Sequence, residues 1–243
     1  MNKTVLVTGA SGGIGSEICR IFAENGFDVI IQYFKNKSAA FALKDELEER
    51  FAVSAFPVCA DLSKSADCEG LARQALALRA GIDVLVNNAG VSLRGVFQLV
   101  EEAQAKRLFA VNTESAMHLC RLLLPQMINR KEGKIVNISS MWGVSGGSCE
   151  VDYSASKAAL IGFTKALSKE VGPSGINVNC VAPGFIETEM NACFDEETKR
   201  QIALESSLEK NGTPRDVAEL VFFLASEKAD FITGQTVSVD GGR

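Results

Sequence analysis

Tyr153 and Lys157 are the residues of this sequence best suited to move a proton. They are four positions apart, so on a helix they lie on the same face. A tyrosine hydroxyl titrates near pKa ~10, and a nearby ammonium group lowers that value by stabilising the phenolate. The pair therefore predicts a proton donor for general acid catalysis. A tyrosine and a lysine at this spacing also occur by chance, so the prediction depends largely on where the pair lies in the fold.

Two serines, Ser139 and Ser140, stand at the end of an expected strand over residues 135–139, shortly before this pair. A serine hydroxyl can donate a hydrogen bond to a carbonyl oxygen. A strand end with serines, followed by the tyrosine and lysine, is much more specific than the pair alone. Together these side chains predict a site where a carbonyl oxygen receives both a hydrogen bond and a proton.

A glycine-rich turn follows the first expected strand, where residues 8–15 have the sequence TGASGGIG. Glycines permit a tight turn and let backbone N–H groups approach a pyrophosphate, which the N-terminus of the following helix attracts. The spacing of Gly9, Gly13 and Gly15 differs from the GxGxxG motif. The alternative is a tight strand–helix connection without a ligand. The position at the start of a βαβ unit favours a dinucleotide.

The end of the second expected strand indicates which dinucleotide is used. Residues 32–38 have the sequence QYFKNKS, with two lysines and no carboxylate. An acidic side chain here would accept from the ribose 2′-hydroxyl of NAD, whereas basic groups accommodate the 2′-phosphate of NADP. The segment predicts NADP(H), with an ordinary solvated loop as the alternative. Asp61 is placed to meet the adenine edge, unless it is only a turn or N-cap aspartate.

The elements that must position these residues alternate between strands and helices. Near-continuous apolar runs predict parallel strands covered on both faces, and helical spacing between them predicts a single-domain α/β Rossmann fold over residues 1–243. We expect a seven-stranded, mostly parallel, doubly wound sheet, and helices over about 101–129 and 152–171. Thr213 and Pro214 have the order of a helix cap and first residue. The polar segment 187–211 is expected to be a helical substrate flap. The expected strands are residues 4–8, 29–33, 53–58, 84–87, 135–139, 176–181 and 236–239.

Composition excludes several classes of function. The 243-residue chain has 30 acidic and 25 basic residues, which argues against a nucleic-acid-binding face. Its apolar runs are too short to span a bilayer, and its N-terminus lacks the pattern of a signal peptide. Seven scattered cysteines predict no disulfide framework and a cytoplasmic location. With His118 as the single histidine, we expect no metal site.

These motifs, in this order, resemble the short-chain dehydrogenase/reductase family along the whole chain. The resemblance implies an NADP(H)-dependent oxidoreductase that forms a homotetramer through the two long helices and the C-terminal strand region. Its ordered blocks are TGASGGIG (8–15), Asp61, NNAG (87–90), Asn112, SMWG (140–143), YSASK (153–157), PGFIET (183–188) and TGQTVSVDGG (233–242).

The resemblance also implies a role for each matching residue. Ser140, with Ser139 as the alternative, would hydrogen-bond the substrate carbonyl, and Tyr153 would donate the proton. Lys157 would also bind the nicotinamide ribose, and Asn112 would hold a water of the proton relay. Cofactor contacts are expected from Gly9, Ser11, Gly13, Ile14, Gly15, Tyr33, Lys35, Asn36, Lys37, Ser38, Asp61, Leu62, Asn88, Ala89, Gly90, Tyr153, Lys157, Pro183, Gly184, Ile186 and Thr188.

Within the family, the chain is most similar to bacterial 3-oxoacyl-(acyl-carrier-protein) reductases of fatty acid biosynthesis. Those enzymes reduce a β-keto thioester and grip the acidic carrier protein with basic residues beside the active-site mouth. Arg130 and Lys131 are the expected counterparts, but the second basic position of the family is Ser174 in this chain.

A second reading rests on the segment 142–151, between the catalytic serine and tyrosine, where Trp142 and Glu150 are expected to meet the substrate. A similar stretch is a feature of reductases that act on the 5-aminopentanone modification of a lysine in elongation factor P. A carboxylate near the pocket suits a substrate that carries an amine, unless Glu150 is only a solvated loop residue. A third reading, a binding protein that senses NADP(H) without catalysis, predicts a damaged catalytic set, whereas the four catalytic positions are all present.

Overall fold

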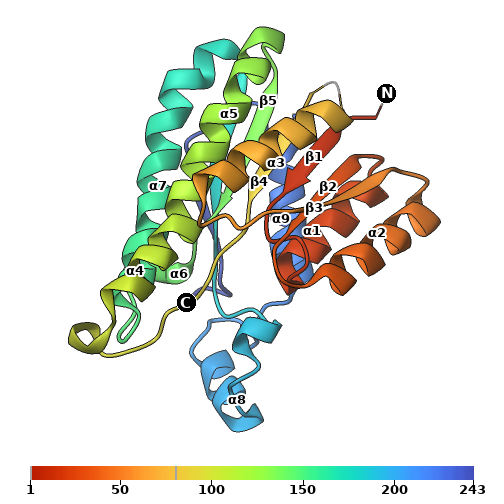
Figure 1. The fold of residues 1–243 in the computed structure, drawn as a ribbon. Coiled ribbons are helices and arrows are strands. Elements are labelled where there is room, and N and C mark those ends of the chain that lie inside the picture. The colour runs from red at the N-terminus through yellow and green to blue at the C-terminus, as the bar shows by residue number, and fades with distance from the viewer. Residues whose placement is uncertain (1, 80) are drawn as a thin grey trace.

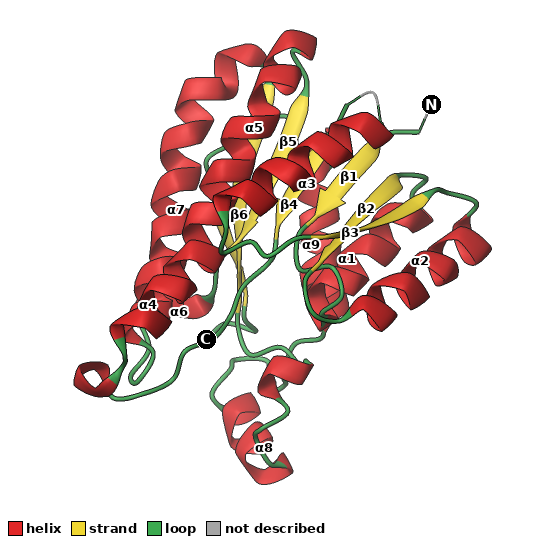
Figure 2. Ribbon diagram, viewed as in Figure 1, coloured by secondary structure: helices red, strands yellow, loops and turns green. Residues whose placement is uncertain are grey.

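The computed structural model describes residues 2–79 and 81–243, and its centre is a β-sheet (Figures 1 and 2), which has seven strands. The strand order is β3-β2-β1-β4-β5-β6-β7, and the described pairings are all parallel. The doubly wound α/β prediction is therefore confirmed. The strands are β1 (Thr4–Val7), β2 (Asp28–Tyr33), β3 (Ala55–Cys59), β4 (Val84–Asn87), β5 (Gly133–Ile138), β6 (Ile176–Pro183) and β7 (Thr236–Val239).

Helices cover both faces of the sheet (Figure 2). Short 3-10 turns lie at Phe97–Leu99, Gly172–Ser174, Glu189–Asn191 and Glu227–Ala229. The α-helices are α1 (Gly13–Glu24), α2 (Lys37–Phe51), α3 (Ser65–Leu78), α4 (Glu102–Phe109), α5 (Ser115–Arg130), α6 (Met141–Ser145), α7 (Val151–Val171), α8 (Glu196–Leu204) and α9 (Pro214–Ala225).

The two helical layers explain why the strands are apolar along their whole length. Successive side chains of a strand point to opposite faces. In β1, Val5 and Val7 belong to the core that α1, α2 and α9 cover, and Leu6 belongs to the core beneath α3, α5 and α7. All three side chains are fully buried. A sheet buried on both faces therefore shows no alternation of polar and apolar residues.

The long helix expected over about 101–129 is present but is interrupted by one π-helical turn. Helix α4 passes into a π turn at Ala110–Glu114 and then into α5. A π turn inserts a residue into the helix and often lies at a functional site. This one contains Asn112, whose side chain turns toward the loop after β4.

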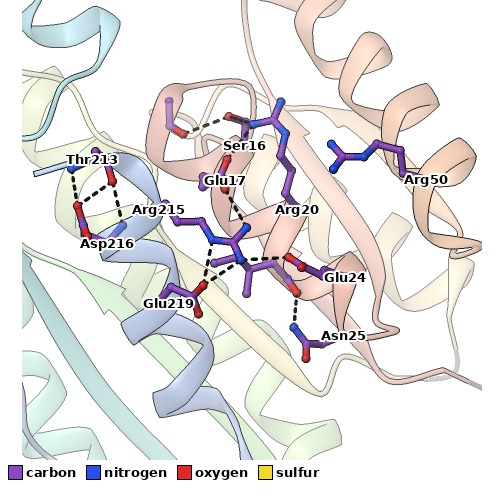
Figure 3. A network of polar contacts seen from close by, with 12 residues as sticks. Ser16, Glu17, Arg20, Glu24, Asn25, Arg50, Thr213, Arg215, Asp216 and Glu219 are labelled. Atoms are coloured by element: carbon purple, nitrogen blue, oxygen red, sulfur yellow. Dashed lines mark hydrogen bonds and ion pairs between the residues drawn. The ribbon is translucent and has the colours of Figure 1, made fainter.

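Helix α1, which begins at the glycine-rich turn, is anchored against α9. Thr213 caps α9 and Pro214 begins it, as expected. Figure 3 shows Arg215 of α9 between carboxylates, with Glu24 at 3.2 Å and Glu219 at 2.9 Å. Such exposed pairs contribute little each, so apolar contacts such as Phe22 against Phe222 hold the two helices together.

No helix among residues 2–79 and 81–243 has the length and apolar character to cross a membrane. Within the same residues, no cluster of histidine, cysteine and acidic side chains forms a metal site. The seven cysteines are free, four of them buried.

Candidate active site

A pocket of about 400 Å³ opens where the carboxyl ends of the parallel strands meet. The glycine-rich turn after β1, the loop after β4, the end of β5 and the end of β6 all line it. This edge is where doubly wound sheets place their ligands. The predicted residues that line the pocket are Gly9, Gly13, Ile14, Gly15, Asn88, Ala89, Gly90, Ser140, Trp142, Glu150, Tyr153, Lys157, Pro183, Gly184, Ile186 and Thr188.

The glycine-rich turn forms a cradle that side chains would fill. Gly9 has a φ of +63°, and its N–H donates to Gln32 Oε1 at 2.8 Å. A Cβ on Gly15 would lie 2.9 Å from Cα of Ala10. Gly12 is the N-cap of α1 and has no side chain to satisfy the first N–H groups of the helix. Those groups are left for an anion, so the turn fits the pyrophosphate of a dinucleotide.

Lys157 lies deep in the pocket wall on α7. Its side chain is buried, and Nζ donates to the backbone oxygen of Ile138 at 2.8 Å. Burial lowers the pKa of Lys157 to about 8. Nζ lies 5.9 Å from the ring centroid of Tyr153, on the same helix face. The spacing argument therefore places the two side chains together correctly.

The lowered pKa expected for the tyrosine beside this lysine is not found. The pKa of Tyr153 is raised, because burial of the phenol outweighs a hydrogen bond with Ser140 and the charge of Arg94. Glu150 raises the pKa further by charge repulsion. A sequence shows that the two residues share a face, but not how deeply the phenol is buried.

The two serines after β5 have different partners. The Ser139 hydroxyl donates to the backbone oxygen of Lys157 at 2.8 Å and is committed to packing α7 against the sheet. Ser140 caps α6, where Oγ accepts from the N–H of Trp142 at 3.2 Å. A Cβ on Gly143 would lie 2.6 Å from the Ser139 hydroxyl oxygen, so a glycine is required there. The hydroxyl of Ser140 is the one beside Tyr153.

Asn112 lies outside the pocket lining and connects it to the π turn. Its Oδ1 accepts from the N–H of Val91 at 2.8 Å, and its Nδ2 donates to the backbone oxygen of the same residue at 3.0 Å. Nδ2 also donates to Ser156 Oγ at 3.1 Å. The side chain thus fixes the loop after β4 against α7, close to Lys157.

The nicotinamide end of the predicted site is built by β6 and the loop after it. Pro183 ends the strand, and a Cβ on Gly184 would lie 2.7 Å from Cα of Asp240, so the chain passes close to the C-terminal segment. Ile186 is buried and pairs with Gly212 in a β-bridge. A Cβ on Gly13 would lie 2.9 Å from Cγ2 of Thr188, which places that threonine against the cradle.

The residues expected at the adenosine end lie on neighbouring loops rather than in this pocket. Tyr33 is buried at the end of β2, and Asn36 caps α2 by accepting from the N–H of Ala39. Asp61 is buried after β3, where Oδ1 accepts from the Ser63 hydroxyl at 2.7 Å. The other residues predicted here are Ser11, Lys35, Lys37, Ser38 and Leu62, of which Leu62 is buried and Lys35, Lys37 and Ser38 are exposed.

The wall of the pocket contains an ion pair between Arg94 and Glu150, a pairing that the sequence did not identify. Glu150, whose side chain is 13% exposed, accepts from Nε of Arg94 at 3.0 Å. The Arg94 guanidinium also lies 4.5 Å from the ring centroid of Phe194. Trp142 stands in the same wall, with the guanidinium of Arg243 at 5.8 Å from its ring centroid. Arg94 and Glu150 are 56 positions apart, so no local sequence pattern indicates their ion pair.

The segment 187–211 borders the other side of the pocket. It contains the turn Glu189–Asn191 and helix α8, which projects beyond the end of the sheet in Figure 1. Asn191, Phe194 and Ile202 line the pocket from this segment. Asn191 Nδ2 donates to the backbone oxygen of Ile186 at 2.9 Å, which holds the segment against the loop after β6.

The expected docking residues Arg130 and Lys131 are not at the mouth of this pocket within one chain. They precede β5 and so lie at the amino edge of the sheet, whereas the pocket is at the carboxyl edge. The six residues of β5 separate the two edges by roughly 20 Å. Arg130 is also bound to Asp83 at 2.7 Å. Proximity in sequence to the strand that precedes the predicted catalytic serine was misleading, because the two ends of a strand lie at opposite edges of the sheet.

Comparison with known proteins agrees with this geometry. The family model "short chain dehydrogenase" matches residues 3–199. An uncharacterized oxidoreductase of Bacillus subtilis, YmfI, is 42% identical over 242 residues, covering 100% of this chain and 99% of that protein. The 3-oxoacyl-(acyl-carrier-protein) reductase FabG of Staphylococcus epidermidis is 36% identical over the same length and coverage.

Two solved structures have the same fold. A blue fluorescent protein from a metagenomic library, in complex with NADPH, has a TM-score of 0.93 and 35% identity, covering 99% of this chain and 97% of that one. The L-sorbose reductase of Gluconobacter frateurii, with NADPH and L-sorbose, has a TM-score of 0.94 and 28% identity, covering 99% and 96%. This chain belongs to the short-chain dehydrogenase family and is an oxidoreductase.

Proposed function

We propose that this protein reduces a carbonyl group to an alcohol with NADPH. The observation that carries the proposal is that one pocket holds Ser140, Tyr153 and Lys157 beside the glycine cradle of α1. The two lysines at the end of β2 support the phosphorylated dinucleotide, and both solved relatives were determined with NADPH. The cofactor, when bound, supplies the hydride.

The side chains of the pocket supply orientation and a proton. Ser140 donates a hydrogen bond to the carbonyl oxygen, and Tyr153 transfers its phenolic proton to the same oxygen as negative charge develops there. The ordinary pKa of a phenol, about 10, already lies above neutral pH, and burial raises the pKa of Tyr153 further, so the phenol holds its proton at neutral pH, as a general acid must. Lys157 returns a proton to the tyrosine, and Asn112 holds the loop and α7 in register for that relay.

The pocket wall favours a polar substrate that carries an amine. Oε1 of Glu150 accepts a hydrogen bond from Arg94, and the second carboxylate oxygen has no hydrogen-bond partner among the described residues. An alkylammonium group would bind this second oxygen as another cation beside Arg94. An alkyl chain would instead remove water from the ion pair, which is unfavourable. The substrate that best fits this chemistry is the 5-aminopentanone group carried by a lysine of elongation factor P.

A second candidate substrate is a 3-oxoacyl thioester on acyl carrier protein. The FabG relative supports it over the whole length of the chain. The positions of Arg130, Lys131 and Ser174 at the amino edge of the sheet do not support carrier-protein docking beside the pocket of the same chain.

The test is NADPH oxidation by the purified protein with each substrate in turn. We expect turnover of elongation factor P that carries the aminopentanone group, and much weaker turnover of acetoacetyl-acyl carrier protein. The reverse ranking would assign the thioester instead.

Tyr153→Phe separates an enzyme from an NADP(H)-binding sensor. The variant should lose about 1,000-fold or more in turnover while binding NADPH as the wild type does. Turnover that survives this change would remove Tyr153 from the mechanism.

A further inference from the structure

Arg107 joins the two loops that form the adenosine end of the proposed cofactor site. It lies in the last turn of α4 and is not part of the lining of the pocket that contains Tyr153. Its Nη1 donates to Ser63 Oγ at 2.9 Å, and its Nη2 lies 3.5 Å from Asp61 Oδ1. The same guanidinium is 5.9 Å from the ring centroid of Phe34, the residue after β2.

These contacts occupy one oxygen of the Asp61 carboxylate. Oδ1 accepts from the N–H and the hydroxyl of Ser63, at 3.1 and 2.7 Å, and faces Arg107. Oδ2 accepts no hydrogen bond from the described residues. Burial alone would raise the pKa of Asp61, but the Ser63 hydrogen bonds and the Arg107 charge outweigh it and lower the pKa. The carboxylate is therefore an ionised acceptor with one oxygen free.

We propose that Arg107 is a positioning residue for the adenosine half of the cofactor, which orients Asp61 so that Oδ2 accepts from the adenine amino group. The proposal rests on the proposed function, NADPH-dependent reduction, and on the expectation that Asp61 meets the adenine edge of that cofactor. A carboxylate held on one oxygen by two hydrogen bonds and an ion pair cannot rotate without breaking them. The guanidinium also contacts both the loop after β2 and the loop after β3, between which an adenine ring would lie.

The test compares cofactors that share or lack the adenosine. We would measure the Kd of NADPH and of NADH for Arg107→Met by titration of the nicotinamide fluorescence. We expect both Kd values to rise by a similar factor of about 10, because both cofactors carry adenine. Lys37→Met is the matched control. If Lys37 binds the 2′-phosphate, its substitution should raise the Kd of NADPH and leave the Kd of NADH unchanged. Arg107→Lys should recover part of the loss.

Reduced nicotinamide mononucleotide, which has no adenosine, separates positioning from damage to the fold. The loss in Arg107→Met should be confined to cofactors with adenosine, so an equal loss with the mononucleotide would show a structural role and overturn the proposal. Unchanged Kd values for NADPH and NADH would also overturn it. If Asp61→Asn weakens NADPH binding while Arg107→Met does not, only this inference fails. If neither variant weakens NADPH binding, the placement of the adenosine at Asp61 fails together with this inference.

Discussion

The hydroxyl of Ser139 donates to the backbone oxygen of Lys157 across 2.8 Å, which leaves Ser140 as the serine available to a substrate. We expect Ser140→Ala to lower kcat/KM by about 100-fold or more, because it removes a hydrogen bond to the reacting oxygen. Ser139→Ala should instead lower the free energy of unfolding by about 1 kcal/mol with a small effect on turnover. Steady-state kinetics and chemical denaturation of both variants check this. A larger kinetic loss in Ser139→Ala would exchange the two roles.

Gly15 and Gly12 form a matched pair in the cofactor cradle. A Cβ on Gly15 would lie 2.7 Å from Asn88 Nδ2 and 2.9 Å from Cα of Ala10, whereas on Gly12 the nearest contact is 3.5 Å. Gly15→Ala should therefore lower the melting temperature by several degrees, roughly 2–4 °C for each kcal/mol lost, and Gly12→Ala should leave it nearly unchanged. Differential scanning fluorimetry without cofactor measures both. Equal melting temperatures would mean that the turn relaxes around a methyl group.

The buried Lys157 predicts a specific dependence of stability on pH. Its pKa is about 8 in the folded protein against an ordinary value of 10.5. Between these values the unfolded chain binds more protons, so the contribution of Lys157 to the free energy of unfolding rises with pH and is constant below the window. Relative to Lys157→Met, the cofactor-free wild type should gain roughly 2 kcal/mol between about pH 7 and 9.5. Urea denaturation at several pH values measures the difference. A constant difference would show that the amine is hydrated.

The carboxylate of Glu150 predicts that its substitution changes KM according to the substrate. If the substrate amine binds its carboxylate, Glu150→Gln should raise KM for the aminopentanone substrate by about 10-fold, because a charged hydrogen bond is replaced by a neutral one. Glu189→Gln, which changes another carboxylate of the pocket lining, is the control. Initial rates over a range of substrate concentrations distinguish the two. Equal KM values in Glu150→Gln and the wild type would assign Glu150 to the packing of Arg94.

Several features of the site follow from local sequence patterns. Tyr153 and Lys157 share a face of α7 because an α-helix brings residues four apart together. The strand-to-helix turn requires glycine at Gly9 and Gly15. The near-continuous apolar sequences of β1 and β5 indicate strands that are buried on both faces. These are interactions between neighbours in the chain, so their pattern is visible in the sequence.

Only the tertiary structure decided the rest. Arg94 and Glu150 are 56 positions apart, and Arg107 and Ser63 are 44 apart, so no local spacing announces either contact. Burial raises the pKa of Tyr153 where the spacing suggested a lower one, because desolvation depends on every element packed around the phenol. The sequence alone determined which residues can do the chemistry, since that depends on residue type and local geometry. Their partners and their charge states were decided by which distant segments the fold brings into contact.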